Sequence, residues 1–249
     1  MRRSEFEGWD VYAVASARPS SKRVIAIHGG AYVAQPTLLH WFDYAALARD
    51  TGATVIVPLY PLAPAGTADT VVPLMADFIA EQVASHGAGN VSLYGDSAGG
   101  GLALAAAQEF VRRNDPRPAH VVLVSPWLDV TLTNPAIASV RDPVLNVTRL
   151  KRDGLLWAGG SDPTDPRVSP LYGSLSGLPP AAVYAGSLDV LSPDVLVLQE
   201  KALATAGAKF TFILRKGEIH NWAMGGLPLL PEAVEVRPDI YRQLGLKTE

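Results

Sequence analysis

Short apolar runs that suit buried strands alternate with helical stretches along most of this chain. Strands and helices that alternate in this way predict an α/β fold, with a mostly parallel sheet and helices on both of its faces. The predicted strands cover residues 23–28, 54–60, 90–94, 120–127, 181–186 and 209–214. The predicted helices cover residues 40–50, 70–87, 102–113, 192–207 and 231–245, the last of them broken near Pro238.

Five chemically distinctive residues follow the ends of predicted strands. Since the carboxyl ends of parallel strands meet at one edge of the sheet, ligands of such folds bind there. We therefore expect these side chains to share one rim of the molecule. They are His28, Tyr60, Ser97, Trp127 and Asp189.

The bulk composition favours one globular domain. The length of 249 residues is enough for one sizeable core. The composition, 48% hydrophobic and 18% charged, is typical of a globular enzyme. The segment 131–170 is rich in Pro, Asp and Gly and interrupts the alternation. We interpret it as an insertion over the sheet edge within a single domain that covers residues 1–249.

Charge and cysteine content exclude several classes of protein. The formal net charge of -3 gives no electrostatic reason to expect nucleic acid or an anionic membrane as a partner. The chain contains no cysteine, so disulfides, thiolate metal sites and a cysteine nucleophile are excluded. No apolar run approaches the roughly 18 residues of a membrane span, and the N-terminus lacks the apolar core of an export signal. We expect a cytoplasmic protein.

The run GDSAGGG, from Gly95 to Gly101, contains no large side chain and lies between a predicted strand and a predicted helix. The pattern G-x-S-x-G is typical of a sharp turn that holds a serine hydroxyl at the N-terminus of a helix. We expect the backbone to pass so close to its neighbours that Gly95 and Gly99 have no room for a Cβ atom. Taken alone, the run also fits an ordinary glycine-rich turn.

A second glycine-rich segment, HGGAY at residues 28–32, directly follows the first predicted strand. Consecutive glycines present N–H groups without obstruction by side chains. Acyl-transfer enzymes need such donors for the tetrahedral oxyanion, and each is worth roughly 3 kcal/mol of the barrier. We expect the N–H groups of Gly29, Gly30 and Ala98 to form this oxyanion hole, with His28 bracing the loop. A plain glycine turn is the alternative.

Seven motifs in order resemble the hormone-sensitive-lipase-like family of α/β-hydrolases. They are HGGAY, YPLAP, GDSAGG, SPWLD, DPRVSPLYGSLSGLPP, GSLDVLSPD and GEIH, and the resemblance extends from Arg23 to about Trp222. It implies the α/β-hydrolase fold with a reduced cap, and cleavage of carboxylic esters through a Ser–Asp–His triad. It implies no cofactor and no metal ion.

The resemblance places the triad at Ser97, Asp189 and His220, in the chain order of α/β-hydrolases. Asp189 ends the motif GSLD after a predicted strand, and we expect it to fix the tautomer of the histidine. Asp194 is the local rival, but it falls in a first helical turn, where the helix dipole accounts for a carboxylate. His220 ends the motif GEIH after the last predicted strand.

Three functions fit this set of residues. The leading one is a serine hydrolase that acts on small-to-medium acyl esters, with lactones as a close variant. An arylformamidase-type amide hydrolase uses the same acyl chemistry. A non-catalytic small-molecule receptor would keep the pocket and lose the histidine, whereas all three triad positions are filled here. We expect no nucleic-acid partner, and a homo-oligomer is compatible with the sequence.

The substrate pocket is predicted from aromatic residues and from the length of the chain. Tyr32, Trp127 and Trp222 are expected to line an apolar pocket, with ordinary core packing as the alternative for each. Only 27 residues precede His28, so the cap must come mostly from segment 131–170, and we expect an open pocket. Ala31 stands where the family has a third glycine, and its N–H is retained.

Overall fold

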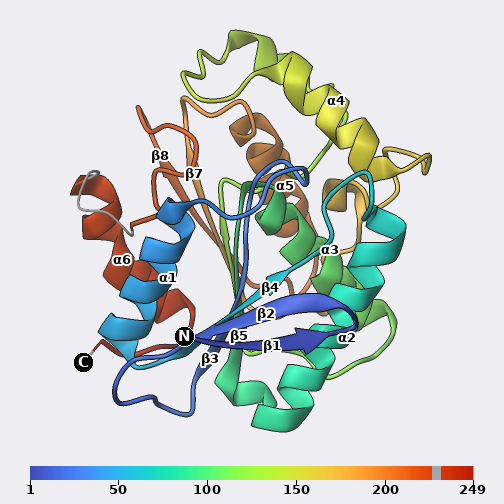
Figure 1. Ribbon diagram of the computed structural model, residues 1–249. Coiled ribbons are helices and arrows are strands. Elements are labelled where there is room, and N and C mark those ends of the chain that lie inside the picture. Colours follow the sequence, from blue (N-terminus) through green and yellow to red (C-terminus); the bar gives the residue numbers. More distant parts are fainter. Residues whose placement is uncertain (226–230, 249) are drawn as a thin grey trace.

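The computed structural model describes residues 1–225 and 231–248 and contains an eight-stranded sheet (Figure 1). The strand order is β1-β2-β4-β3-β5-β6-β7-β8. Strands β3 to β8 run parallel to one another, and β2 is antiparallel to both of its neighbours, β1 and β4. All six predicted strands are present, and the mostly parallel sheet is confirmed. The strands are β1 Arg2–Phe6, β2 Trp9–Val14, β3 Arg23–Ile27, β4 Thr54–Leu59, β5 Val91–Asp96, β6 His120–Val124, β7 Ala181–Gly186 and β8 Phe210–Arg215.

The two N-terminal strands were not predicted. They form a tight hairpin in which Phe6 pairs with Trp9 and the turn consists of Glu7 and Gly8. Both turn residues have positive φ angles, 45° and 81°, which suit the right-handed twist of the flanking strands. Glu is uncommon at a left-handed turn position, so the sequence lacks the Asn-Gly or Asp-Gly signal of such hairpins.

Helices cover both faces of the sheet, as predicted. Helices α1 and α6 pack on one face, and α2, α3 and α5 pack on the other (Figure 1). Neighbouring residues of β3 point alternately into the two cores, with Val24 on the α1 side and Ile25 on the α2 side. The helices are α1 Leu38–Thr51, α2 Ala68–His86, α3 Ser97–Arg112, α4 Val147–Ala158, α5 Ser192–Ala204 and α6 Pro231–Gln243.

The helices differ from their predicted bounds by a few residues, and two differences have a clear physical reason. Helix α3 begins at Ser97 rather than at Leu102, so the glycines that follow Ser97 are helical. They are needed because other backbone lies against the first turn of this helix. Helix α6 continues through Pro238, whose exposed position makes the loss of one backbone hydrogen bond tolerable.

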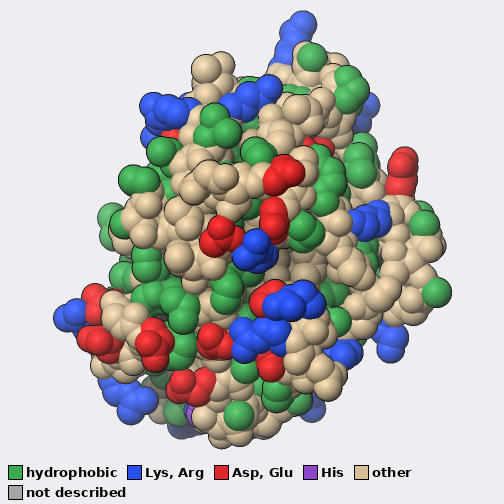
Figure 2. All heavy atoms as spheres, turned by 90° about the vertical axis from the view of Figure 1, so that its right-hand side faces the viewer, with side chains coloured by type: hydrophobic (Ala, Val, Ile, Leu, Met, Phe, Trp, Pro, Cys, Tyr) green, Lys and Arg blue, Asp and Glu red, His purple; other side chains and the backbone are tan. Residues whose placement is uncertain are grey.

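Segment 131–170 contains α4 and lies over the carboxyl ends of the strands (Figure 1). Asp142 joins this segment to the loop after β7, since its Oδ2 accepts a hydrogen bond of 2.9 Å from the Val190 N–H. Lys, Arg and apolar side chains gather at this end of the molecule, where few acidic side chains are visible (Figure 2). The segment thus forms a roof over this edge of the sheet.

Candidate functional site

Ser97 lies on a strained turn between β5 and α3, with a positive φ angle of 52°. A Cβ atom on Gly95 would lie 2.5 Å from the Gly99 carbonyl oxygen, and one on Gly99 would lie 2.0 Å from the Ile27 carbonyl oxygen. Only glycine fits at either position. The turn therefore holds the Ser97 hydroxymethyl group at the N-terminus of α3, where partial positive charge favours an anion.

Asp189 and His220 form a hydrogen-bonded pair. His220 Nδ1 lies 2.9 Å from Asp189 Oδ2, and the other Asp189 oxygen accepts a 2.9 Å hydrogen bond from the Leu191 N–H. Asp189 is completely buried on the turn after β7, and His220 lies on the loop after β8. A carboxylate at Nδ1 keeps the proton there, so the neutral ring carries its lone pair on Nε2.

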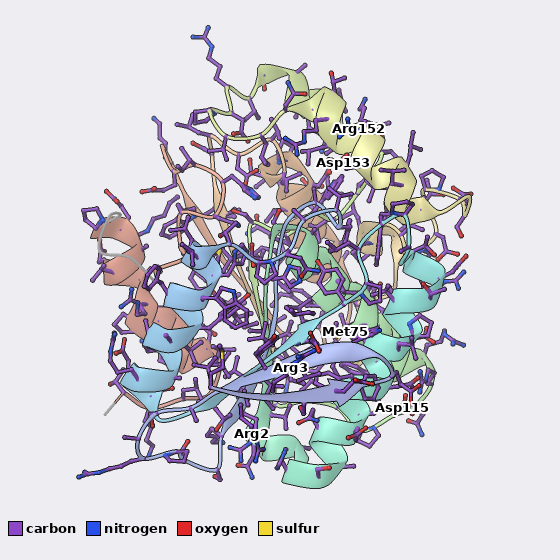
Figure 3. The ribbon with its side chains drawn as sticks, viewed as in Figure 1. Arg2, Arg3, Met75, Asp115, Arg152 and Asp153 are labelled. Carbon is purple, nitrogen blue, oxygen red and sulfur yellow. The ribbon has the colours of Figure 1, made fainter. Side chains whose placement is uncertain are left out.

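Ser97 and His220 line the same cavity, whose volume is about 280 Å³. One wall is apolar, and segment 131–170 forms the roof. Within helix α4 of this roof, Asp153 is buried and the neighbouring Arg152 is exposed (Figure 3). The lining side chains from the roof are Val144, Leu145, Asn146, Arg149, Leu150 and Asp153, and those from the loop after β3 include Val33 and Ala34. Among the described residues, none before Gly30 lines this cavity.

Asp96, next to Ser97, connects three segments of the site. Its buried carboxylate accepts hydrogen bonds from the Gly29 N–H at 3.0 Å, from His40 Nε2 at 3.3 Å and from Asn221 Nδ2 at 2.9 Å. Burial alone would raise the pKa of Asp96, but the charge and hydrogen bond of His40 and the Gly29 N–H hold it below its usual value. Asp96 thereby ties the loop after β3, helix α1 and the His220 loop to the turn at Ser97.

Sequence reasoning missed Asn221 and placed His40 only within a helix. Asn221 adopts a left-handed conformation, with φ at 57°, and its N–H donates to Ser125 Oγ at 3.0 Å. Asparagine tolerates this conformation better than most residues. Its position directly after a candidate catalytic histidine was the available signal.

The predicted oxyanion donors need one correction. The Gly29 N–H donates to Asp96 and is not available to a substrate. Gly30 and Ala31 line the cavity, whereas Gly29 and Ala98 are not among its lining residues. Ala98 is the second residue of α3, so its N–H has no acceptor inside the helix. Gly30, Ala31 and Ala98 are therefore the candidate donors.

The three aromatic residues predicted to line the pocket do not reach the cavity. Tyr32 is buried between Trp127 and Trp157, with ring centroids 5.5 Å and 4.0 Å away. Trp222 is buried on the other face of the sheet, where the Arg215 guanidinium lies 4.8 Å from its ring centroid. These large rings fill the cores and fix loops, because burial of their area stabilises the fold more than exposure in a cavity would.

Nearby carboxylates determine the charge of His220. Burial lowers its pKa, but Asp189 raises it by charge and hydrogen bonding, and Asp96 and Asp142 add to this effect. The net result is a pKa above the ordinary value of 6.5. Asp194 does not contact His220. Its Oδ1 accepts from Asn134 Nδ2 at 2.9 Å, and burial raises its pKa to about 6.

Residues 1–225 and 231–248 contain no cluster of three or more His, Asp or Glu side chains arranged to hold a metal ion. Within the same residues, no helix combines the length and the apolar character needed to cross a bilayer.

Comparison with known proteins gives consistent matches. A family model described as the alpha/beta hydrolase fold matches residues 24–224. The chain is 46% identical over 242 residues to a triacylglycerol lipase of Mycobacterium tuberculosis, an alignment that covers 97% of this chain and 50% of the lipase. It is 34% identical to an acetyl-hydrolase of Streptomyces hygroscopicus, covering 90% of this chain and 76% of that protein. The chain thus spans about half the length of the mycobacterial relative.

A solved structure of an esterase from the bacterial hormone-sensitive lipase family superimposes with a TM-score of 0.86. The sequence identity is 29%, and the match covers 98% of this chain and 84% of that one.

Proposed function

The chain belongs to the α/β-hydrolase fold family, and on this basis we propose that it hydrolyses carboxylic esters with Ser97 as nucleophile. The observation that carries the proposal is the shared cavity of Ser97 and His220, with His220 held at Nδ1 by the buried Asp189. The lipase, acetyl-hydrolase and esterase relatives support the same reaction class.

In the first half of the reaction, His220 Nε2 takes the proton of Ser97 Oγ as this oxygen bonds to the ester carbonyl carbon. The carbonyl oxygen becomes an oxyanion, which the N–H groups of Gly30, Ala31 and Ala98 stabilise. When the intermediate collapses, the bond to the alcohol oxygen breaks and His220 gives that oxygen its proton. The acyl group remains on Ser97.

Water completes the reaction. His220 takes a proton from the water as its oxygen attacks the acyl carbon, and the bond to Ser97 Oγ breaks while His220 returns the proton to it. The products are the carboxylic acid and free enzyme. Asp189 stabilises the imidazolium in both halves.

The cavity favours small-to-medium acyl groups. Its volume of about 280 Å³ is at the lower end of small-molecule sites, and Val33, Ala34 and Leu150 make part of its wall apolar. Lactones use the same steps, with the ring oxygen as the leaving group that stays attached to the acyl chain.

A substrate panel tests this function. We expect p-nitrophenyl esters to be hydrolysed, with kcat/KM highest at short to medium acyl lengths and lower for long chains. A γ-lactone and an aromatic N-formyl amide should be measured alongside. Faster turnover of the formyl amide than of every ester would replace the proposal by an amide hydrolase. Saturable binding of esters without turnover would replace it by a receptor.

The pH dependence follows from the charge of His220. The base must be neutral to accept a proton, so activity is lost as the pH falls through its pKa. The sequence alone predicts a midpoint near 6.5, whereas the surrounding carboxylates move it above that value. The log of kcat/KM for a short ester, plotted against pH, should bend above 6.5. A profile that stays flat to about pH 5 would contradict the role of His220.

A further inference from the structure

Exposed apolar side chains lie on two of the segments that line the cavity. Val144 lines the cavity and is nevertheless 55% exposed. Leu38 and Leu39, in the first turn of α1, directly precede the cavity-lining His40 and are 74% and 54% exposed. One exposed leucine is ordinary, but exposed apolar side chains on two segments of the same cavity favour contact with another apolar phase.

The roof of the cavity also carries positive charge. Residues 141–153 contain four cations and two carboxylates, a formal charge of +2 in a chain whose net charge is -3. Asp153 pairs with two of these cations, since its Oδ1 lies 2.8 Å from Arg152 Nη2 and its Oδ2 lies 3.7 Å from Arg149 Nε. Arg141 and Lys151 form no such pair with Asp153 or Asp142, so they carry the excess positive charge of this segment. The cations are exposed, and they are Arg141, Arg149, Lys151 and Arg152.

We define the rim surface as these apolar and basic side chains, which belong to the first turn of α1 and to residues 141–152, two segments that contribute lining residues to the cavity. Its six central members are Leu38, Leu39, Arg141, Val144, Arg149 and Lys151. In Figure 2 the end of the molecule formed by segment 131–170 shows this mixture of basic and apolar side chains, while acidic side chains lie mainly lower on the molecule.

We propose that the rim surface docks on an anionic lipid–water interface, with the cavity mouth facing the lipid. Each Lys or Arg near an anionic bilayer strengthens binding by about fivefold, and exposed leucines gain by entering the boundary between headgroups and acyl chains. Docking in this orientation brings an ester in the interface to Ser97 without passage through water. This last step rests on the proposed function, whereas docking itself does not.

The charge of the rim surface favours lipid over a second copy of the chain. A two-fold dimer through this face would bring the same cations against one another. The net charge of -3 does not reveal this basic segment, because it is a sum over the whole chain and includes acidic residues elsewhere. The expectation that an anionic membrane is no partner rested on that sum.

The test measures binding of the Ser97→Ala protein to vesicles, so that hydrolysis does not enter the readout. We expect it to partition onto phosphatidylcholine vesicles that contain phosphatidylglycerol and to bind far less to phosphatidylcholine alone. Adding Arg141→Glu and Lys151→Glu, neither of which lines the cavity, should lower partitioning onto the anionic vesicles by at least about 30-fold at low salt.

A matched control carries the same charge change at the opposite end of the sheet. Arg18 and Lys209 are exposed and precede β3 and β8, so Arg18→Glu with Lys209→Glu leaves the rim surface intact. This variant should keep most of the binding. Leu38→Ser should weaken binding without changing the charge.

Three results would overturn the proposal: no binding of the parent protein to anionic vesicles, equal loss in the rim and control variants, or a dimer in light scattering that the rim variant dissociates. A second assay tests the proposed function independently of vesicle binding. It measures hydrolysis of a soluble short ester by the Arg141→Glu/Lys151→Glu enzyme that retains Ser97. We expect that activity to remain within about twofold of the parent, since both side chains are exposed and neither lines the cavity.

Discussion

Replacement of Ser97 by alanine is expected to lower kcat for a short p-nitrophenyl ester by on the order of 10⁵, a loss of about 7 kcal/mol in transition-state stabilisation. In the proposed reaction Ser97 supplies the oxygen that forms the covalent intermediate, and Ser97 lines the same cavity as His220. Alanine removes that oxygen and leaves the turn and the oxyanion donors in place. Steady-state kinetics on purified protein measure the change, and the melting temperature checks that the fold is intact.

Ser85→Ala provides the matched control. Ser85 is exposed on α2 and does not line the cavity, so its loss should leave kcat unchanged. A fall in Ser97→Ala of less than about tenfold, at unchanged melting temperature, would remove Ser97 from the role of nucleophile.

The second large effect is expected for Asp189→Asn, which should reduce kcat by about 10⁴. The amide has nearly the volume of the carboxylate but can donate a hydrogen bond to His220 Nδ1. That favours the tautomer whose proton is on Nε2, so the ring can no longer accept the proton of Ser97. It also removes the negative charge that stabilises the imidazolium. The measurement is again kcat for the short ester, with KM expected to change little.

Asp194→Asn separates the two candidate carboxylates. Asp194 is buried and bonded to Asn134, and its pKa is raised to about 6, so an amide resembles its protonated form. Because it does not contact His220, the expected change in kcat is within about threefold. If Asp194→Asn were the more damaging substitution, Asp189 would not be the triad acid.

The sequence predicts best where the decisive contacts are local. The turn at Ser97 illustrates this in part. A Cβ atom on Gly95 would meet the Gly99 carbonyl oxygen within the same turn, whereas Gly99 is required by the carbonyl oxygen of Ile27, which lies far away in the sequence. The six parallel strands were likewise visible as short apolar runs bounded by helical segments. The hairpin at Glu7 and Gly8 escaped prediction because its turn lacks the usual residue types.

The sequence predicts less where a residue has two chemically reasonable partners. Gly29 was assigned to the oxyanion hole because glycine N–H groups are good donors, but only the folded chain brings Asp96 within 3.0 Å of that N–H. Tyr32, Trp127 and Trp222 were assigned to the pocket because aromatic rings suit one, yet the same rings fill cores equally well.

By itself, the sequence determined the α/β class, the strained turn at Ser97 and the order of Ser97, Asp189 and His220 along the chain, because these depend on neighbouring residues and on motif identity. Tertiary structure alone decided that the Gly29 N–H donates to Asp96 and that Asn221 and His40 meet on the same carboxylate. Each of these depends on segments that are far apart in the sequence, and their proximity is fixed by how the helices and the sheet pack rather than by any local preference.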